Sequence, residues 1–101
     1  MYEIKNLNRL LFLKSKIFPM KMEENETIAL FVARIKNLKT KLSNIGHTMD
    51  DTDLVTITIN GVTDDYQMFI TGINAREKIL HFEEMTGILM QEEERRSTLK
   101  L

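Results

Sequence analysis

The clearest pattern of hydrophobic and polar positions lies between residues 28 and 45. Most gaps between successive apolar residues there are three or four positions, which places these side chains on one stripe of an α-helix. The polar face opposite carries Arg34, Lys36, Lys39 and Lys41. We therefore predict a central helix whose core-facing residues are Ile28, Phe31, Val32, Ile35, Leu38, Leu42 and Ile45.

The ends of this helix also have sequence signals. Thr27 or Asn25 can cap its start, because a short oxygen side chain accepts a hydrogen bond from a first-turn N–H. Gly46 is predicted to end the helix, since glycine adopts the left-handed conformation without a steric penalty.

A first helix is predicted over residues 3–18, before Pro19, which disfavours helical geometry in the residue that precedes it. Its apolar residues form two neighbouring edges: Ile4, Leu7, Leu11 and Phe18 on one, and Leu10, Leu13 and Ile17 on the other. This face is wider than a surface helix needs. We expect the first helix to pack against more than one partner.

Residues 54–62 fit two local structures. The run from Val55 to Ile59 alternates apolar and polar side chains and is rich in β-branched residues, which is typical of a strand. The same apolar residues can share one face of a helix, and the aspartates before them resemble a helix start, with Thr48 or Asp50 as the cap. We favour the helix, because the backbone groups of an isolated strand would lack partners.

The remaining chain shows two further helical patterns. After a cap at residues 63–65, one stripe contains Tyr66, Phe69, Ile70 and Ile73. A connector from Ala75 to Leu80 leads to a last helix, whose inward residues are Phe82, Met85, Ile88 and Leu89. Together these segments predict an all-α fold, a small bundle of about five short helices in a single domain over residues 1–101.

Composition and charge narrow the classes of protein. The 101 residues are 43% hydrophobic and 29% charged, which is ordinary for a globular domain. No cysteine is present, which fits a reducing compartment, and we expect a cytoplasmic location with no membrane segment and no signal peptide. Residues 1–42 hold nine Lys/Arg against four Asp/Glu, a balance of +5, whereas residues 43–101 hold five against eleven, a balance of −6. This split indicates either head-to-tail contact between copies or two differently solvated faces.

No motif for catalysis or ligand binding is present in the sequence. His47 and His81 have no second metal ligand at helical spacing, and the paired carboxylates fall where helix capping explains them. The four glycines are isolated, so they form no phosphate-binding loop. We expect a protein that is not an enzyme, with no catalytic, metal, cofactor or small-molecule site.

An ordered series of segments nevertheless resembles one family, the Gag polyprotein of copia-type LTR retrotransposons. No single segment is diagnostic, but their order and spacing cover almost the whole chain. They are Arg9–Phe18, Met20–Glu24, the central helix through Leu42–Gly46, Asp50–Val55, Ile59–Val62, Asp65-Tyr66, Phe69, Ala75–Glu77 and Leu89–Arg96.

The resemblance implies a capsid-region domain, retroviral-capsid-like in fold, that associates with copies of itself in a particle around the element's RNA. It also implies a helix over residues 50–62. The chain departs from the family pattern at Thr63, where members usually have proline, and at His81, where they usually have a threonine-like cap. The zinc knuckle of Gag does not follow, so we expect only indirect contact with RNA and an N-terminally truncated piece of Gag.

Two hypotheses for function follow. One is self-association as a homo-oligomer in capsid or virus-like particle assembly, through a face formed by Leu7, Leu10, Leu11, Leu13 and Phe18 or through the last helix. The alternative is a host-adopted or generic helical module that binds another protein's helix in a groove. Direct RNA binding is a third option, for which the lysines of the first 42 residues are the candidates.

Overall fold

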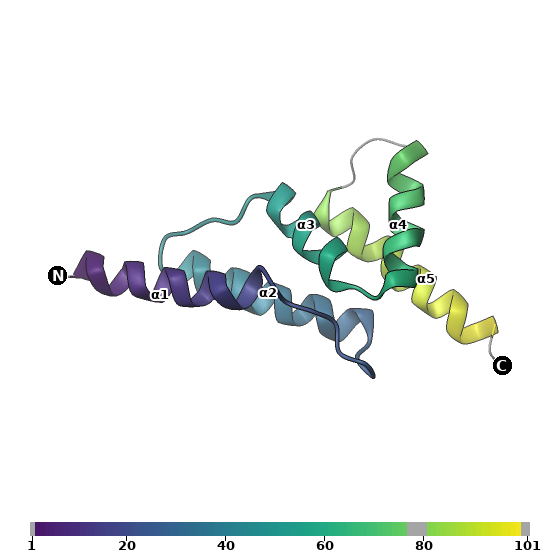
Figure 1. Ribbon diagram of the computed structural model, residues 1–101, viewed down its shortest axis with the longest axis horizontal. Coiled ribbons are helices and arrows are strands. Elements are labelled where there is room, and N and C mark those ends of the chain that lie inside the picture. The colour runs from purple at the N-terminus through teal and green to yellow at the C-terminus, as the bar shows by residue number, and fades with distance from the viewer. Residues whose placement is uncertain (1, 77–80, 100–101) are drawn as a thin grey trace.

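The computed structural model describes residues 2–76 and 81–99, and these residues form five helices without a strand (Figure 1). The helices are α1 (Tyr2–Ile17), α2 (Ile28–Asn44), α3 (Asp51–Gly61), α4 (Asp64–Arg76) and α5 (Phe82–Leu99). The predicted all-α bundle of about five short helices is confirmed. The connector predicted from Ala75 to Leu80 begins inside α4, and the rest of it lies outside the described residues.

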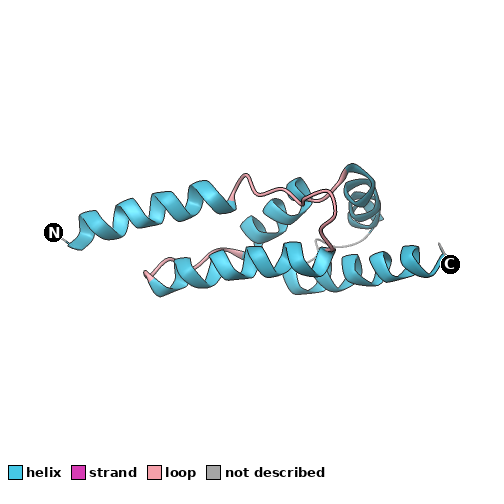
Figure 2. Ribbon diagram, turned by 90° about the horizontal axis from the view of Figure 1, so that it is seen from below, coloured by secondary structure: helices cyan, strands magenta, loops and turns pink. Residues whose placement is uncertain are grey.

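The first two helices form an antiparallel hairpin (Figure 2). α1 ends at Ile17, two residues before Pro19, although the backbone N–H of Phe18 still donates to the Lys14 carbonyl at 3.1 Å. The predicted bounds of 3–18 are therefore correct to one residue at each end. The chain reverses direction between Phe18 and Thr27, which returns α2 along α1.

The apolar stripe of α2 forms the centre of the core. Its members Ile28, Phe31, Val32, Ile35 and Leu42 are buried, and Leu38 and Ile45 are partly buried against them. The Thr27 hydroxyl accepts a hydrogen bond from Leu30 N–H at 3.1 Å, so threonine is the cap rather than asparagine. Gly46, with a φ of +89°, follows the helix as predicted.

The ambiguous segment folds as α3, so the strand alternative is wrong. Its apolar residues face the core, where Leu54, Val55 and Ile57 are buried. The hydroxyl of the buried Thr58 donates to the Leu54 carbonyl at 2.8 Å, and that of Thr56 donates to the Thr52 carbonyl at 2.9 Å. These bonds satisfy the threonine hydroxyls within the helix, which removes the cost of burying one of them.

The last two helices present the stripes predicted for them. In α4, Tyr66 and Ile70 are buried, while Phe69 and Ile73 are partly buried. In α5, the buried residues are Phe82, Met85 and Leu89, with Ile88 partly buried. α5 packs against α2, α3 and α4, so it joins the hairpin of α1 and α2 to the other two helices.

Two helices receive caps from other helices. The Glu93 carboxylate of α5 accepts a hydrogen bond from Ile28 N–H, the first backbone donor of α2. The Asp51 carboxylate of α3 does the same for Phe82 N–H of α5, at 3.0 Å, and its other oxygen lies 3.1 Å from His81 Nδ1. Asp50 occupies the N-cap position of α3, but its side chain makes no capping bond. The carboxylates therefore connect helices as well as stabilising helix ends.

The molecule is elongated, with extents of 56 × 30 × 18 Å. The N-terminal half of α1 extends past the other helices at one end, and α4 lies toward the opposite end (Figure 1). The solvent-facing sides of α1 and α4 therefore lie far apart along the long axis of the molecule.

Candidate interaction surface

The two apolar edges of α1 have different environments. The inner edge, formed by Leu10, Leu13 and Ile17, packs into the core: Leu13 is 3% exposed, Ile17 is fully buried, and Leu10 is partly buried. α2 is the helix against which α1 packs most extensively. One edge is therefore sufficient to attach α1 to the rest of the bundle.

The outer edge of α1, which we define as Leu7, Leu11 and Phe18, faces solvent. The exposed fractions of these side chains are 52%, 55% and 42%. Their spacing of four and seven residues keeps them in line, because the helical hydrogen bonding continues to Phe18. The side chain of Ile4, which the sequence places on the same edge, lies outside the described part.

The predicted self-association face therefore needs one correction. Leu7, Leu11 and Phe18 are exposed and Leu10 is half-buried, but Leu13 belongs to the core and is not available at the surface. The sequence also missed Phe12, which is 56% exposed and has the Lys16 ammonium 5.4 Å from its ring centroid. Phe12 lies on the side of the helix away from the inner edge, so a helical projection would have predicted its exposure.

The connection between α1 and α2 is fixed by a charged network. The Arg34 guanidinium donates to both oxygens of Glu26, at 2.6 and 2.7 Å, and to the Lys21 carbonyl at 2.7 Å. The Arg34 hydrogen bond lowers the pKa of Glu26, so this carboxylate stays ionised. Met22 N–H donates to the Gly61 carbonyl at 2.7 Å, which ties the same connection to the end of α3. These bonds hold the connection that follows α1 against α2 and the end of α3.

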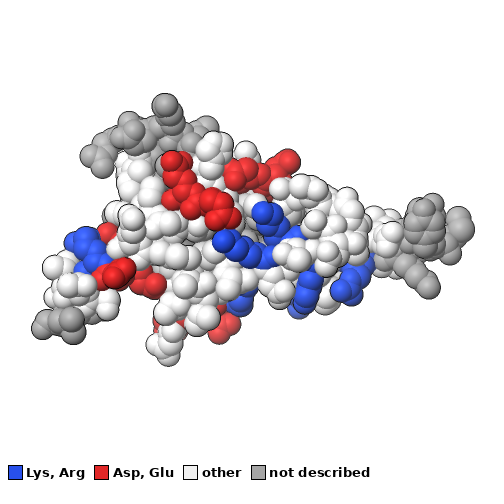
Figure 3. Space-filling model, turned by 180° about the vertical axis from the view of Figure 1, so that it is seen from behind, with Lys and Arg blue, Asp and Glu red and all other residues white. Residues whose placement is uncertain are grey.

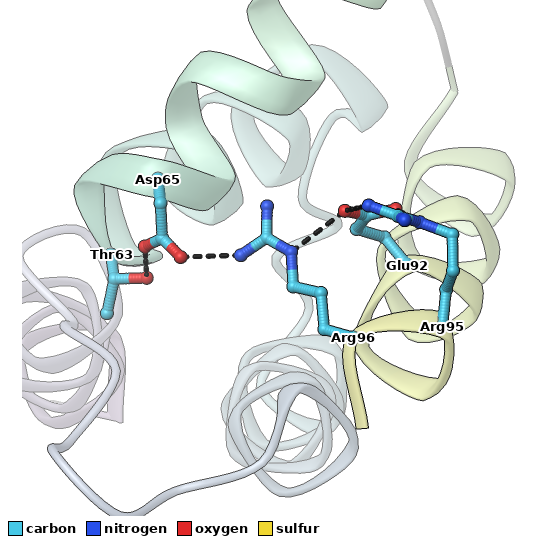
Figure 4. Close-up of polar contacts among 5 residues, drawn as sticks. All are labelled: Thr63, Asp65, Glu92, Arg95 and Arg96. Atoms are coloured by element: carbon cyan, nitrogen blue, oxygen red, sulfur yellow. Dashed lines mark hydrogen bonds and ion pairs between the residues drawn. The ribbon is translucent and has the colours of Figure 1, made fainter. Parts of the chain in front are cut away.

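A second charged cluster joins α4 to α5 (Figure 4). The Arg96 guanidinium lies between Asp65 of α4 and Glu92 of its own helix, with nitrogen–oxygen distances of 2.5 and 2.8 Å. It also lies 4.2 Å from the ring centroid of Tyr66. Arg95 donates twice to Glu92, whose side chain is only 6% exposed. Hydrogen bonds from the two arginines lower the pKa of Glu92 to about 2.

The chemistry of these groups is that of structural ion pairs. A general acid needs a raised pKa, whereas Glu26, Asp65 and Glu92 all have lowered values. Within residues 2–76 and 81–99, no group of three His, Asp or Glu side chains is arranged to hold a metal ion. His81 pairs with Asp51 at a helix start, and no third such side chain joins this pair within the described residues.

The uneven charge of the sequence is visible on the surface. On the face shown in Figure 3, Lys and Arg side chains predominate toward the N-terminal end, and Asp and Glu side chains predominate on the other half. α1 contains four Lys/Arg and one Asp/Glu, whereas the first turns of α3, α4 and α5 are acidic. No helix in the described part of the chain is long and apolar enough to cross a bilayer.

Comparison with known proteins gives one match. A family model described as gag-polypeptide of LTR copia-type matches residues 1–100. Searches of the curated proteins and of the solved structures found no match. The predicted likeness to retroviral capsid proteins therefore stays a prediction.

Proposed function

Since the chain belongs to the gag-polypeptide family of copia-type LTR elements, we propose that it is a structural Gag domain that associates with copies of itself during particle assembly. The family membership supports a structural role in Gag. Self-association is the further step, and it rests on the surface of α1.

The observation that carries the proposal is the exposed outer edge of α1. Single exposed leucines are common on protein surfaces and need no explanation. Three large apolar side chains aligned along one helix are a different feature, because this spacing is the one by which helices pack against each other. Burying their exposed portions would contribute roughly 1 kcal/mol each. The edge is thus suited to contact with another folded helix.

The position of α1 strengthens this interpretation. The inner edge is in the core and the Arg34 network fixes the connection to α2, so the outer edge is held in a defined orientation. A preorganised surface loses little conformational entropy on association. Contact between copies is therefore expected to need no rearrangement of the bundle.

Sedimentation velocity at several concentrations tests the proposal. The parent chain is expected to form dimers or larger species as concentration rises, and a double Leu7→Ser/Leu11→Ser variant should associate more weakly. A matched control is Leu30→Ser, because Leu30 of α2 is 59% exposed but lies outside the outer edge. A parent that stays monomeric at high micromolar concentration would contradict self-association and favour a module that binds a different protein's helix.

A further inference from the structure

A second exposed surface, with one large apolar side chain, lies on α4, toward the end of the molecule opposite the N-terminus (Figure 1). We define the α4 outer surface as Asp64, Met68, Thr71 and Gly72, which fall on the side of the helix away from its buried residues. Met68 is 76% exposed. Together with Gln67, the last three residues line a shallow hollow of about 440 Å³, and the space around the Gly72 Cα is open.

We propose that Leu7 and Leu11 of the α1 outer edge in one copy dock on the α4 outer surface of a second copy, which makes a head-to-tail contact. This inference rests on the self-association proposed above and adds which two surfaces meet. Bulky leucines on one helix would insert beside the small side chains of the other. In the assembly, each of these surfaces would thus be covered by the other surface of a neighbouring copy.

The spacing of the two surfaces is compatible with an antiparallel arrangement. Leu7, Leu11 and Lys14 span seven residues, or roughly 10 Å of helix, and Gly72, Met68 and Asp64 span eight, or roughly 12 Å. With the helices antiparallel, Leu7 would lie over Gly72, Leu11 beside Met68, and Lys14 near Asp64. Lys14 follows Leu11 by three residues, so it is close to the line of the outer edge.

Charge favours this pairing over contact between two α1 helices. α1 has an excess of three positive charges, and two α1 helices side by side would bring these together. The first turn of α4, by contrast, carries Asp64 and Asp65, which are both exposed. Asp65 is paired with Arg96, so Asp64 is the carboxylate that would face Lys14. An antiparallel contact would place the basic last turn of α1 next to this acidic turn, and it would also oppose the two helix dipoles favourably.

The location of the two surfaces has a consequence for assembly. Because α1 and α4 lie toward opposite ends of a molecule 56 Å long, one copy can use both surfaces at once (Figure 1). Contacts between two different surfaces generate rings or open chains, whereas contacts between identical surfaces stop at a dimer. The inferred contact therefore predicts growth beyond the dimer.

A mixing experiment distinguishes these arrangements. Leu11→Ser disables only the α1 edge, and Met68→Lys disables only the α4 surface, because it places a charged group beside the apolar side chain of Leu11. Each variant alone should associate about tenfold or more weakly than the parent, as measured by sedimentation velocity. An equimolar mixture still contains one intact surface of each kind, so it should form a 1:1 complex that does not grow with concentration.

The controls separate this inference from self-association itself. Both substituted side chains are more than half exposed, so circular dichroism and melting should match the parent. Thr71→Arg, also at an exposed position on the α4 surface, replaces Met68→Lys if that variant melts early. If the parent associates and Met68→Lys and Thr71→Arg associate equally well, or if the mixture forms no complex, the head-to-tail contact is wrong while self-association stands. A monomeric parent would refute both.

Discussion

The Glu93 carboxylate on α5 accepts a hydrogen bond of 2.9 Å from the backbone N–H of Ile28, the first residue of α2. The first backbone N–H groups of a helix have no partner within the helix, so a carboxylate there satisfies a donor and interacts favourably with the helix dipole. Thr27 supplies a second bond, to Leu30 N–H. This contact places α5 against the start of the central helix.

Replacing Glu93 should therefore destabilise the bundle. We expect Glu93→Ala to reduce the free energy of unfolding by about 1 kcal/mol, the usual cost of losing a helix cap. Glu93→Gln should lose less, because its amide oxygen can still accept the bond. Urea denaturation measures the difference, and Glu94→Ala is the control at an exposed neighbouring position. Equal effects at both positions would mean that the capping bond adds nothing.

Acid should weaken the contact between α4 and α5 through Glu92. Its pKa is held at about 2 in the folded chain, against an ordinary value of 4.5. The stability that Glu92 contributes is thus fully present above pH 4.5 and is lost as the pH falls toward 2. The stability difference between the parent and Glu92→Gln should shrink over this range. A difference that is independent of pH would show that the arginines do not hold Glu92 ionised.

Substitution by alanine should change the stability of the protein in opposite directions at two glycines. A Cβ at Gly61 would overlap the Phe31 ring and lie 2.6 Å from the Met20 carbonyl oxygen, so we expect Gly61→Ala to cost about 1–3 kcal/mol. A Cβ at Gly87 meets nothing within 4 Å, and Gly87→Ala should gain about 0.5–1 kcal/mol of helix stability. Thermal melting of the two variants compares them directly, and a loss at Gly87 or a gain at Gly61 would contradict the packing described here.

Cavities in the α2 stripe should lower the free energy of unfolding. Phe31 and Ile35 are fully buried, so we expect Phe31→Ala to cost about 3–5 kcal/mol and Ile35→Ala about 2–5 kcal/mol. A domain of this size has a total stability of roughly 5–15 kcal/mol, so either variant can unfold a substantial fraction of the protein. Ala33→Ser, at an exposed position of the same helix, is the control. Parent-like melting of both core variants would mean that the stripe is not the core.

The sequence was sufficient to predict what depends on local pattern. The stripe from Ile28 to Ile45 has a single helical period and clear end signals, so both the helix and its buried face follow from it. Residues 54–62 were ambiguous because β-branched side chains suit either structure. Burial of Leu54 and Ile57 against other helices decides between them, and this is a tertiary effect that local propensity does not contain.

Features that depend on distant residues could not be predicted. The Glu93–Ile28 bond joins positions 65 residues apart, and no local pattern links them. No local pattern shows that Gly61 permits the close approach of Phe31. For the candidate surface, the sequence identified two apolar edges on the first helix but could not say which one α2 covers. Leu13 of the inner edge was included in the predicted self-association face for that reason, although it is buried.

Self-association of this Gag-family chain underlies both proposals. Sedimentation equilibrium over a range of concentrations tests it most directly, because it measures the average mass of the species in solution. We predict that the average mass rises from the 11.8 kDa of one chain to at least twice that value as the concentration increases. A mass that stays at 11.8 kDa up to high micromolar concentration would rule out self-association of this chain.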